Sequence, residues 1–85
     1  MQLTIITPDQ QVFSGEVSSA TFPGEEGSFQ VLHNHAPLIS ALGKGTIRYR
    51  GSGQEQSVIV EGGVVEVLKN NITVLAERVI TPKVE

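Results

Sequence analysis

Cysteine is absent from this chain of 85 residues. Without cysteine there is no disulfide to stabilise the fold and no thiolate cluster to hold a metal ion. The absence also favours a reducing compartment. Aromatic residues are scarce as well, with one tyrosine and three phenylalanines, so a surface built from exposed aromatic rings is not expected.

Basic residues are outnumbered, six against nine acidic ones, which gives a formal net charge of -3. No basic face is available to neutralise phosphates, and we therefore expect no nucleic acid partner. Long apolar runs are missing too, because no stretch approaches the roughly 18 residues that span a bilayer. The N-terminal residues M-Q-L-T-I-I-T-P lack the basic start and the long apolar core of a signal peptide, and we expect none.

The length predicts one domain, residues 1–85. With 39 % apolar residues the chain is expected to fold, but so short a chain buries only about 60–65 % of its unfolded surface. Its core is therefore modest, and a permanent partner would stabilise it.

No window shows sustained helical periodicity, whereas β-branched and alternating segments recur between glycine- and proline-containing turns. This pattern predicts an all-β sandwich or barrel. Turns are expected at 23–27, at Gly62-Gly63 and at 69–71. The expected strands are 3–7, 12–13, 17–22, 29–31, 37–42, 46–50, 54–60, 64–68 and 72–76.

Two strand patterns predict which faces are buried. Residues 46–50 alternate, with Ile47 and Tyr49 pointing inward, as in a half-buried antiparallel strand. Residues 58–60, 64–68 and 72–76 are apolar on both faces instead. One face packs on the opposite layer, and the other needs a second cover that so short a chain cannot supply. We therefore predict a surface for a partner.

The most distinctive side chains lie between residues 22 and 45. Glu25 and Glu26 occupy a glycine-flanked turn, and His33 and His35 follow two residues apart. A metal site is one reading of the histidines, but zinc requires three or four ligands and no third is evident. Adjacent acids on a solvated turn suit electrostatic docking to a basic patch better than acid–base catalysis.

Other catalytic patterns are also missing. The serines lie in no nucleophile-elbow context, and the paired glycines precede no helix and lack the ending of a phosphate loop. We therefore expect a non-enzymatic protein with no cofactor and no bound metal.

Several motifs, in order along the chain, resemble the epsilon subunit of F-type ATP synthases, and the similarity covers residues 1 to about 81. These motifs are P-D-Q-Q-V-F-S-G at 8–15, P-G-E-E-G-S-F-Q-V-L at 23–32, H-A-P-L-I-S-A-L at 35–42, G-G-V-V-E-V at 62–67 and N-I-T-V-L-A-E at 71–77.

The resemblance implies a flattened antiparallel β-sandwich of about ten strands at the foot of the central stalk. Such a domain does no covalent chemistry. It binds the gamma subunit and the membrane c-ring, and so couples ring rotation to the shaft during ATP synthesis. By position, Glu25, Glu26, Ser28 and His35 are expected to contact the c-ring. Thr7 and Ser40 are expected to contact the gamma subunit.

Two departures from the family accompany this resemblance. Many relatives carry an acid at the position of Ser28, and the usual C-terminal helical hairpin, which carries the inhibitory role, is not present in these 85 residues. The expected location is the cytoplasmic face of a bacterial inner membrane, with membrane contact only through the complex. The alternative is a free-standing β-sandwich that binds a ligand such as a sugar.

Overall fold

Residues 1–80 are described by the computed structural model, and they form eight strands joined by short turns. None of these residues belongs to a helix long and apolar enough to cross a membrane. The strands are β1 (Gln2–Ile6), β2 (Gln11–Glu16), β3 (Ser19–Gly24), β4 (Gly27–Leu32), β5 (Leu38–Gly51), β6 (Gln54–Leu68), β7 (Asn71–Ala76) and β8 (Val79–Ile80).

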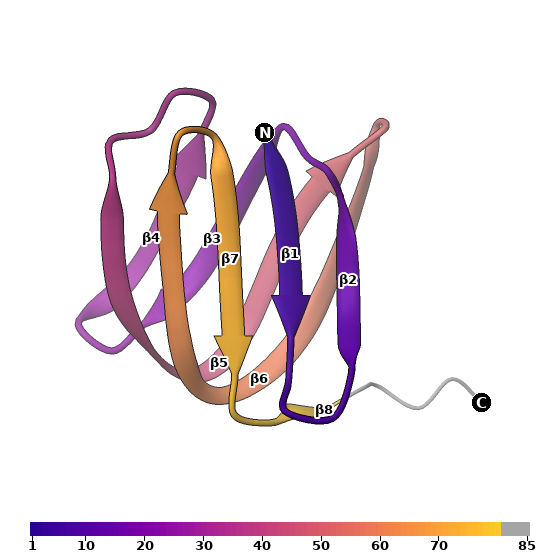
Figure 1. The fold of residues 1–85 in the computed structure, drawn as a ribbon. Coiled ribbons are helices and arrows are strands. Elements are labelled where there is room, and N and C mark those ends of the chain that lie inside the picture. Colours follow the sequence, from indigo (N-terminus) through magenta and orange to yellow (C-terminus); the bar gives the residue numbers. More distant parts are fainter. Residues whose placement is uncertain (81–85) are drawn as a thin grey trace.

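One hydrogen-bonded sheet, in the order β2-β1-β7-β6-β5-β3-β4, folds back on itself to make two layers. In Figure 1 the long strands β5 and β6 curve together at the bottom of the molecule and pass from one layer to the other. The first layer contains β2, β1, β7, the second half of β6 and the first half of β5. The second layer contains β4, β3 and the remaining halves of β5 and β6, with β8 paired to β6.

Glycines allow the two long strands to bend. The pairing of β5 with β6 keeps one register throughout, with Leu42 opposite Gly63 and Lys44 opposite Glu61, so Gly43 and Gly62 fall opposite each other at the corner. Gly62 and Gly63 have φ angles of 78° and 136°, which side-chain-bearing residues rarely adopt. Glycine within a strand often marks a tight bend at such a corner.

Alternate residues of both layers point inward and form a single apolar core. Among the described residues no polar or charged side chain is buried. Phe22 is fully buried, and Tyr49, 7 % exposed, packs its ring 4.5 Å from that of Phe13. The largest fully buried side chains are Phe22, Leu3, Ile5, Leu42, Ile47, Ile72, Val31, Val60, Val65, Val67 and Val74.

The predicted all-β sandwich is confirmed, and so are the inward positions of Ile47 and Tyr49. The strand count differs, since eight strands are present rather than about ten. Counting each half of β5 and β6 separately would give ten, because each half lies in a different layer. The sheet is also not wholly antiparallel, since β1 pairs with β7 in parallel.

The predicted turn at Gly62-Gly63 is wrong, because β6 continues through both glycines. The turn expected at 69–71 is present, with Lys69 and Asn70 at φ angles of 51° and 62°, and Asn71 already begins β7. Residues 81–85 of the predicted domain lie outside the described part of the chain.

We expect Gly63→Ala to destabilise the fold by about 3 kcal/mol, because the substitution combines a strained φ with a steric clash. A Cβ at Gly63 would overlap the carbonyl oxygen of Leu75 and lie 2.9 Å from the Cα of Ala76, both on the neighbouring strand. Urea unfolding measures the loss.

Gly53→Ala is the matched control, because Gly53 also has a positive φ, 76°, but a Cβ there meets nothing within 4 Å. Its cost should stay near 1 kcal/mol. Equal losses for the two variants would show that the corner is not tightly packed.

Candidate docking surfaces

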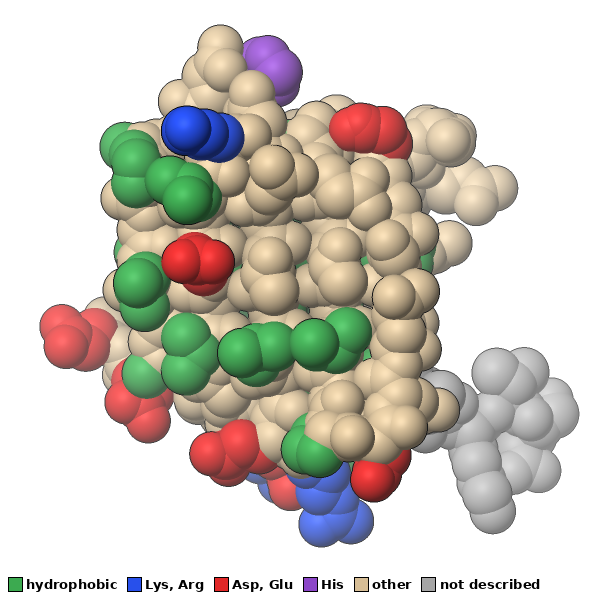
Figure 2. Space-filling model, viewed as in Figure 1, with side chains coloured by type: hydrophobic (Ala, Val, Ile, Leu, Met, Phe, Trp, Pro, Cys, Tyr) green, Lys and Arg blue, Asp and Glu red, His purple; other side chains and the backbone are tan. Residues whose placement is uncertain are grey.

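Apolar side chains cover the outer face of the first layer, the side turned away from the core. Figure 2 shows them as bands across this side of the molecule. Ile39 is 72 % exposed and Leu75 is 51 % exposed, so a large part of each aliphatic side chain is in contact with water. We call this surface the apolar face, and it consists of Ile6, Ile39, Ala41, Val64, Leu68 and Leu75.

Strand register aligns part of this face into a continuous row. Ala41 on β5 lies opposite Val64 on β6, Val64 lies opposite Leu75 on β7, and Leu75 lies opposite Ile6 on β1. Polar Gln11 of the edge strand β2 lies opposite Ile6 and ends the row. An apolar row bounded by a polar rim is typical of a surface that another protein covers.

A shallow hollow with a volume of about 350 Å³ extends this row at the end of β1 and β7. Ile6, Pro8 and Leu75 give it an apolar lining, and Thr7 and Glu77 lie at its border. The hydroxyl of Thr7 is within 3.3 Å of both the N–H and the carbonyl oxygen of Gln10, and so closes the turn between β1 and β2. Thr7, a predicted gamma contact, therefore lies beside the apolar face.

The acidic turn between β3 and β4 projects from the side of the sandwich. Glu25 and Glu26 are the two turn residues, both exposed, between Gly24 and Gly27, which are paired. The N–H of Glu25 donates to the carbonyl oxygen of Ala41 at 3.1 Å, which fixes the turn against β5. None of the ion pairs in the described part of the chain involves either glutamate.

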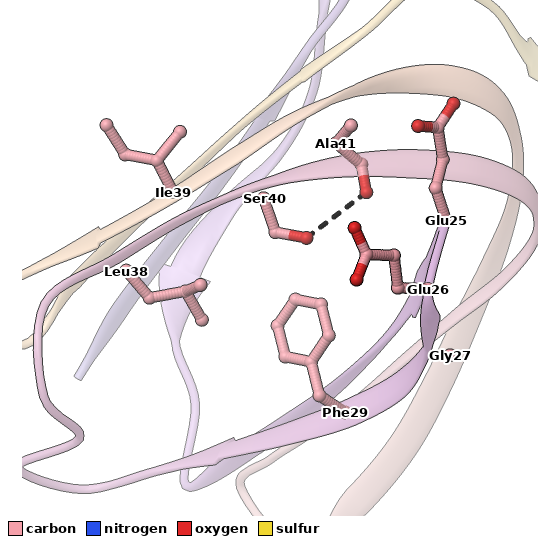
Figure 3. Close-up of a pocket in the computed structure, with 8 residues that line it drawn as sticks. All are labelled: Glu25, Glu26, Gly27, Phe29, Leu38, Ile39, Ser40 and Ala41. Carbon is pink, nitrogen blue, oxygen red and sulfur yellow. Dashed lines mark hydrogen bonds between the residues drawn. The ribbon is translucent and has the colours of Figure 1, made fainter.

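Between this turn and the first half of β5 lies a second hollow, drawn in Figure 3, with a volume of about 360 Å³. The ring of Phe29 occupies its middle and packs 5.5 Å from the buried ring of Phe22. A Cβ on Gly24 would come within 3.0 Å of the Phe29 ring, so glycine at this position leaves room for the ring. The hydroxyl of Ser40 donates to the carbonyl oxygen of Ala41 at 3.2 Å inside the hollow.

The histidine loop, residues 33–37, lies at the opposite end of β4. Asn34, with a φ of 64°, donates its N–H to Oδ1 of Asn70 at 2.7 Å, and Nδ2 of Asn70 donates to Oδ1 of Asn34 at 3.0 Å. These reciprocal bonds attach the loop to the β6–β7 turn. Nδ1 of His35 lies 2.7 Å from the carbonyl oxygen of Ala36.

The structure brings together only some of the predicted c-ring contacts. Glu25, Glu26 and Ser28 lie at the acidic turn and at the start of β4. His35 follows the far end of β4, and a strand of six residues is about 20 Å long. Ser40, a predicted gamma contact, lines the hollow together with Ile39 and Ala41, but it does not belong to the apolar face, because its side chain alternates with theirs along β5.

No group of three His, Cys, Asp or Glu side chains in residues 1–80 is arranged to hold a metal ion. The one titration shift resolved there concerns Tyr49, where burial raises the pKa of the hydroxyl above its usual value. Tyr49 belongs to the core and is no candidate acid or base. The geometry of the described residues therefore favours contact surfaces over a catalytic site.

Sequence reasoning predicted an uncovered apolar face but missed two of its features. Ile39, its most exposed member, was assigned only to a strand, and Glu66, in the middle of the face, was not singled out. The period-two pattern of β6 was a usable signal for Glu66, because it places this residue on the same side as Val64 and Leu68.

Comparison with known proteins gives a consistent family match. The family model for the ATP synthase delta/epsilon chain, β-sandwich domain, matches residues 1–82. An ATP synthase epsilon chain of Pelotomaculum thermopropionicum is 48 % identical over 75 residues, 88 % of this chain and 56 % of that protein. One from Nitratidesulfovibrio vulgaris is 46 % identical over 77 residues, 91 % of this chain and 58 % of that protein. The chain thus spans a little over half the length of these relatives.

Solved structures share the fold. A chain of the mitochondrial ATP synthase of Euglena gracilis superimposes with a TM-score of 0.84 at 21 % identity, covering 92 % of this chain and 51 % of that one. A chain from the central stalk and c-ring structure of the Tetrahymena thermophila enzyme gives 0.79 at 17 % identity, covering 93 % and 64 %. At such identities the likeness concerns the fold alone.

We expect Asn70→Gly to release the histidine loop without unfolding the protein. Glycine tolerates the positive φ of this turn position but removes both side-chain bonds to Asn34. Hydrogen exchange should show faster exchange of the Asn34 N–H, and the free energy of unfolding should fall by about 1 kcal/mol. Lys69→Gly, at the neighbouring positive-φ position, should leave that exchange unchanged. Unchanged exchange in Asn70→Gly would refute the attachment.

Proposed function

Because this chain belongs to the family of ATP synthase delta/epsilon β-sandwich domains, we propose that it is a non-catalytic domain of the central stalk that couples c-ring rotation to the gamma subunit. The observation that carries this proposal is the apolar face, in a chain whose relatives bear the name ATP synthase epsilon chain. A coupling element must hold two partners firmly, and this molecule presents two chemically different surfaces, the apolar face and the acidic turn, which adjoin at the hollow between them.

The gamma subunit is the proposed cover of the apolar face. Burying exposed aliphatic side chains contributes about 25 cal/mol per Å² of apolar surface, so a partner that covers Ile39, Val64 and Leu75 is bound mainly by the hydrophobic effect. Thr7 at the border of the face supports this assignment. Ser40 meets the same partner only where that partner reaches around the edge of β5 into the hollow.

The c-ring is the proposed partner of the acidic turn. Glu25 and Glu26 are exposed, lie on a short turn fixed to β5, and pair with no basic group of residues 1–80. A partner that carries basic side chains here would therefore find unpaired carboxylates. Ser28 lies next to this turn. A ring contact that also includes His35 must follow the outer edge of β4 for its whole length.

A ligand-binding sandwich is less well supported. Sugar sites rely on exposed aromatic rings, whereas Phe22 and Tyr49 are buried and Phe13 and Phe29 are half-buried. We also propose a position on the cytoplasmic face of a bacterial membrane, reached through the complex, which agrees with the bacterial origin of the similar epsilon chains.

The gamma assignment predicts that Val64→Asp together with Leu75→Asp weakens binding to the purified gamma subunit at least about 100-fold, because two carboxylates would be buried in an apolar contact. Both side chains are about half-exposed, 42 % and 51 %, so the fold should persist in circular dichroism. Isothermal titration calorimetry measures the affinity.

Ser57→Asp is the control, because Ser57 is exposed on β6 in the second layer, away from the apolar face. It should bind as the unmodified chain does. Absence of binding by the unmodified chain at micromolar concentration would overturn the proposed function. Equal binding by the double variant and the unmodified chain would show that the apolar face is not the gamma-binding surface.

The ring assignment predicts that reversing Glu25 and Glu26 to lysine lowers binding of the gamma-bound chain to purified c-ring about tenfold or more at low salt, and by less at high salt. Exposed turn charges contribute little to folding, so unfolding curves should change by less than about 1 kcal/mol. The matched control reverses Glu16 and Glu55, which are exposed on β2 and β6. Equal losses in both double variants would point to net charge rather than to this turn.

A further inference from the structure

One carboxylate interrupts the apolar face. Glu66 lies opposite Ile39 on β5 and opposite Thr73 on β7, and its neighbours on the same side of β6 are Val64 and Leu68. It therefore has exposed apolar side chains on three sides and a threonine on the fourth. Figure 2 shows an acidic side chain set among the apolar ones at this place.

Glu66 has no counter-charge within the described part of the chain. The ion pairs of residues 1–80 join Glu16 to the N-terminal amine, Glu55 to Arg50, and Glu61 to Lys44 and Arg78. No side-chain hydrogen bond within residues 1–80 involves the carboxylate of Glu66 either. Water solvates it in the free protein, because the residue is exposed.

A protein that covers the apolar face removes this water. An ionised carboxylate placed against apolar atoms loses its hydration and gains nothing in return, which costs more than neighbouring apolar contacts supply. The cost is offset only where the partner places a positive charge at hydrogen-bonding distance, since charge-assisted bonds are the strongest replacement for lost water.

We propose that the partner covering the apolar face carries a lysine or arginine side chain that pairs with Glu66. The inference rests on the proposed function, because it assumes that the gamma subunit is this cover. Glu66 then acts as a specificity determinant. A purely apolar surface of similar shape is rejected, and so is a second copy of this chain, whose own face presents the same negative charge.

The direction in which Glu66→Gln changes the affinity tests whether the partner pairs a positive charge with Glu66. The amide keeps the size of the side chain and removes its charge. With a cation opposite, the variant leaves that cation buried and unpaired, and binding to the purified gamma subunit should weaken about 30-fold or more. With an apolar surface opposite, the variant lowers the desolvation cost, and binding stays equal or tightens, which would overturn the inference.

Two further variants are compared with Glu66→Gln by calorimetry. Glu66→Asp keeps the charge on a shorter side chain and should recover part of the affinity that Glu66→Gln loses. Glu55→Gln, an equal charge change in the second layer, should alter affinity less than about twofold, since exposed pairs contribute little. A loss of affinity in Glu66→Asp with none in Glu66→Gln would show a requirement for the length of the side chain rather than for its charge and would also overturn the inference.

These results are distinguishable from failure of the proposed function. An unmodified chain that does not bind the gamma subunit overturns both proposals. An unmodified chain that binds, and whose affinity falls in Val64→Asp with Leu75→Asp but not in Glu66→Gln, overturns only the charge pairing.

Discussion

The bend that β5 and β6 share is the constraint on which the rest of this molecule depends. Both strands cross from one layer to the other at Gly43 and at Gly62-Gly63, so a single hairpin contributes two paired strands to each layer. The shorter strands then add outward, β7, β1 and β2 on one layer and β3 and β4 on the other. Their inward side chains fill one core. Gly63 packs tightly against β7, because a Cβ at this position would overlap the backbone of Leu75.

A two-layer sandwich of this size has one core and two outer faces, and residues 1–80 supply no third layer to cover either of them. The second half of β6 and β7 are nevertheless apolar on both sides. The inward set, which includes Val65, Val67 and Val74, is buried, whereas the outward set, which includes Val64 and Leu75, stays exposed. Large exposed apolar patches on a small protein mark sites of association. The same strand composition therefore stabilises the fold and supplies the docking face.

Features set by neighbouring residues could be predicted from the sequence, whereas features set by the pairing of distant strands could not. Alternation at 46–50 identified the inward side chains Ile47 and Tyr49, because strand geometry alone determines which way they point. The turn predicted at Gly62-Gly63 is wrong, since the same dipeptide serves hairpin turns and bends within a strand, and only pairing with β5 tells them apart. The predicted ring contacts of Glu25 and His35 share a short stretch of sequence, yet β4 separates them by its full length. Spacing along the chain does not show how far apart two residues lie in the fold.

Glu66 illustrates why exposure and composition together say more than either alone. An apolar face that binds by the hydrophobic effect is non-directional and accepts many partners, including another copy of itself. One carboxylate in its middle changes this, because every partner must then either satisfy a negative charge or leave it dehydrated. In the free protein, water solvates the Glu66 carboxylate, so its charge costs nothing and keeps the face soluble. Under a partner, the same charge must be matched by a positive charge on the partner's surface. The proposed coupling role requires firm binding to one particular partner. An apolar face with a single interior charge combines strength from its aliphatic side chains with selectivity from Glu66.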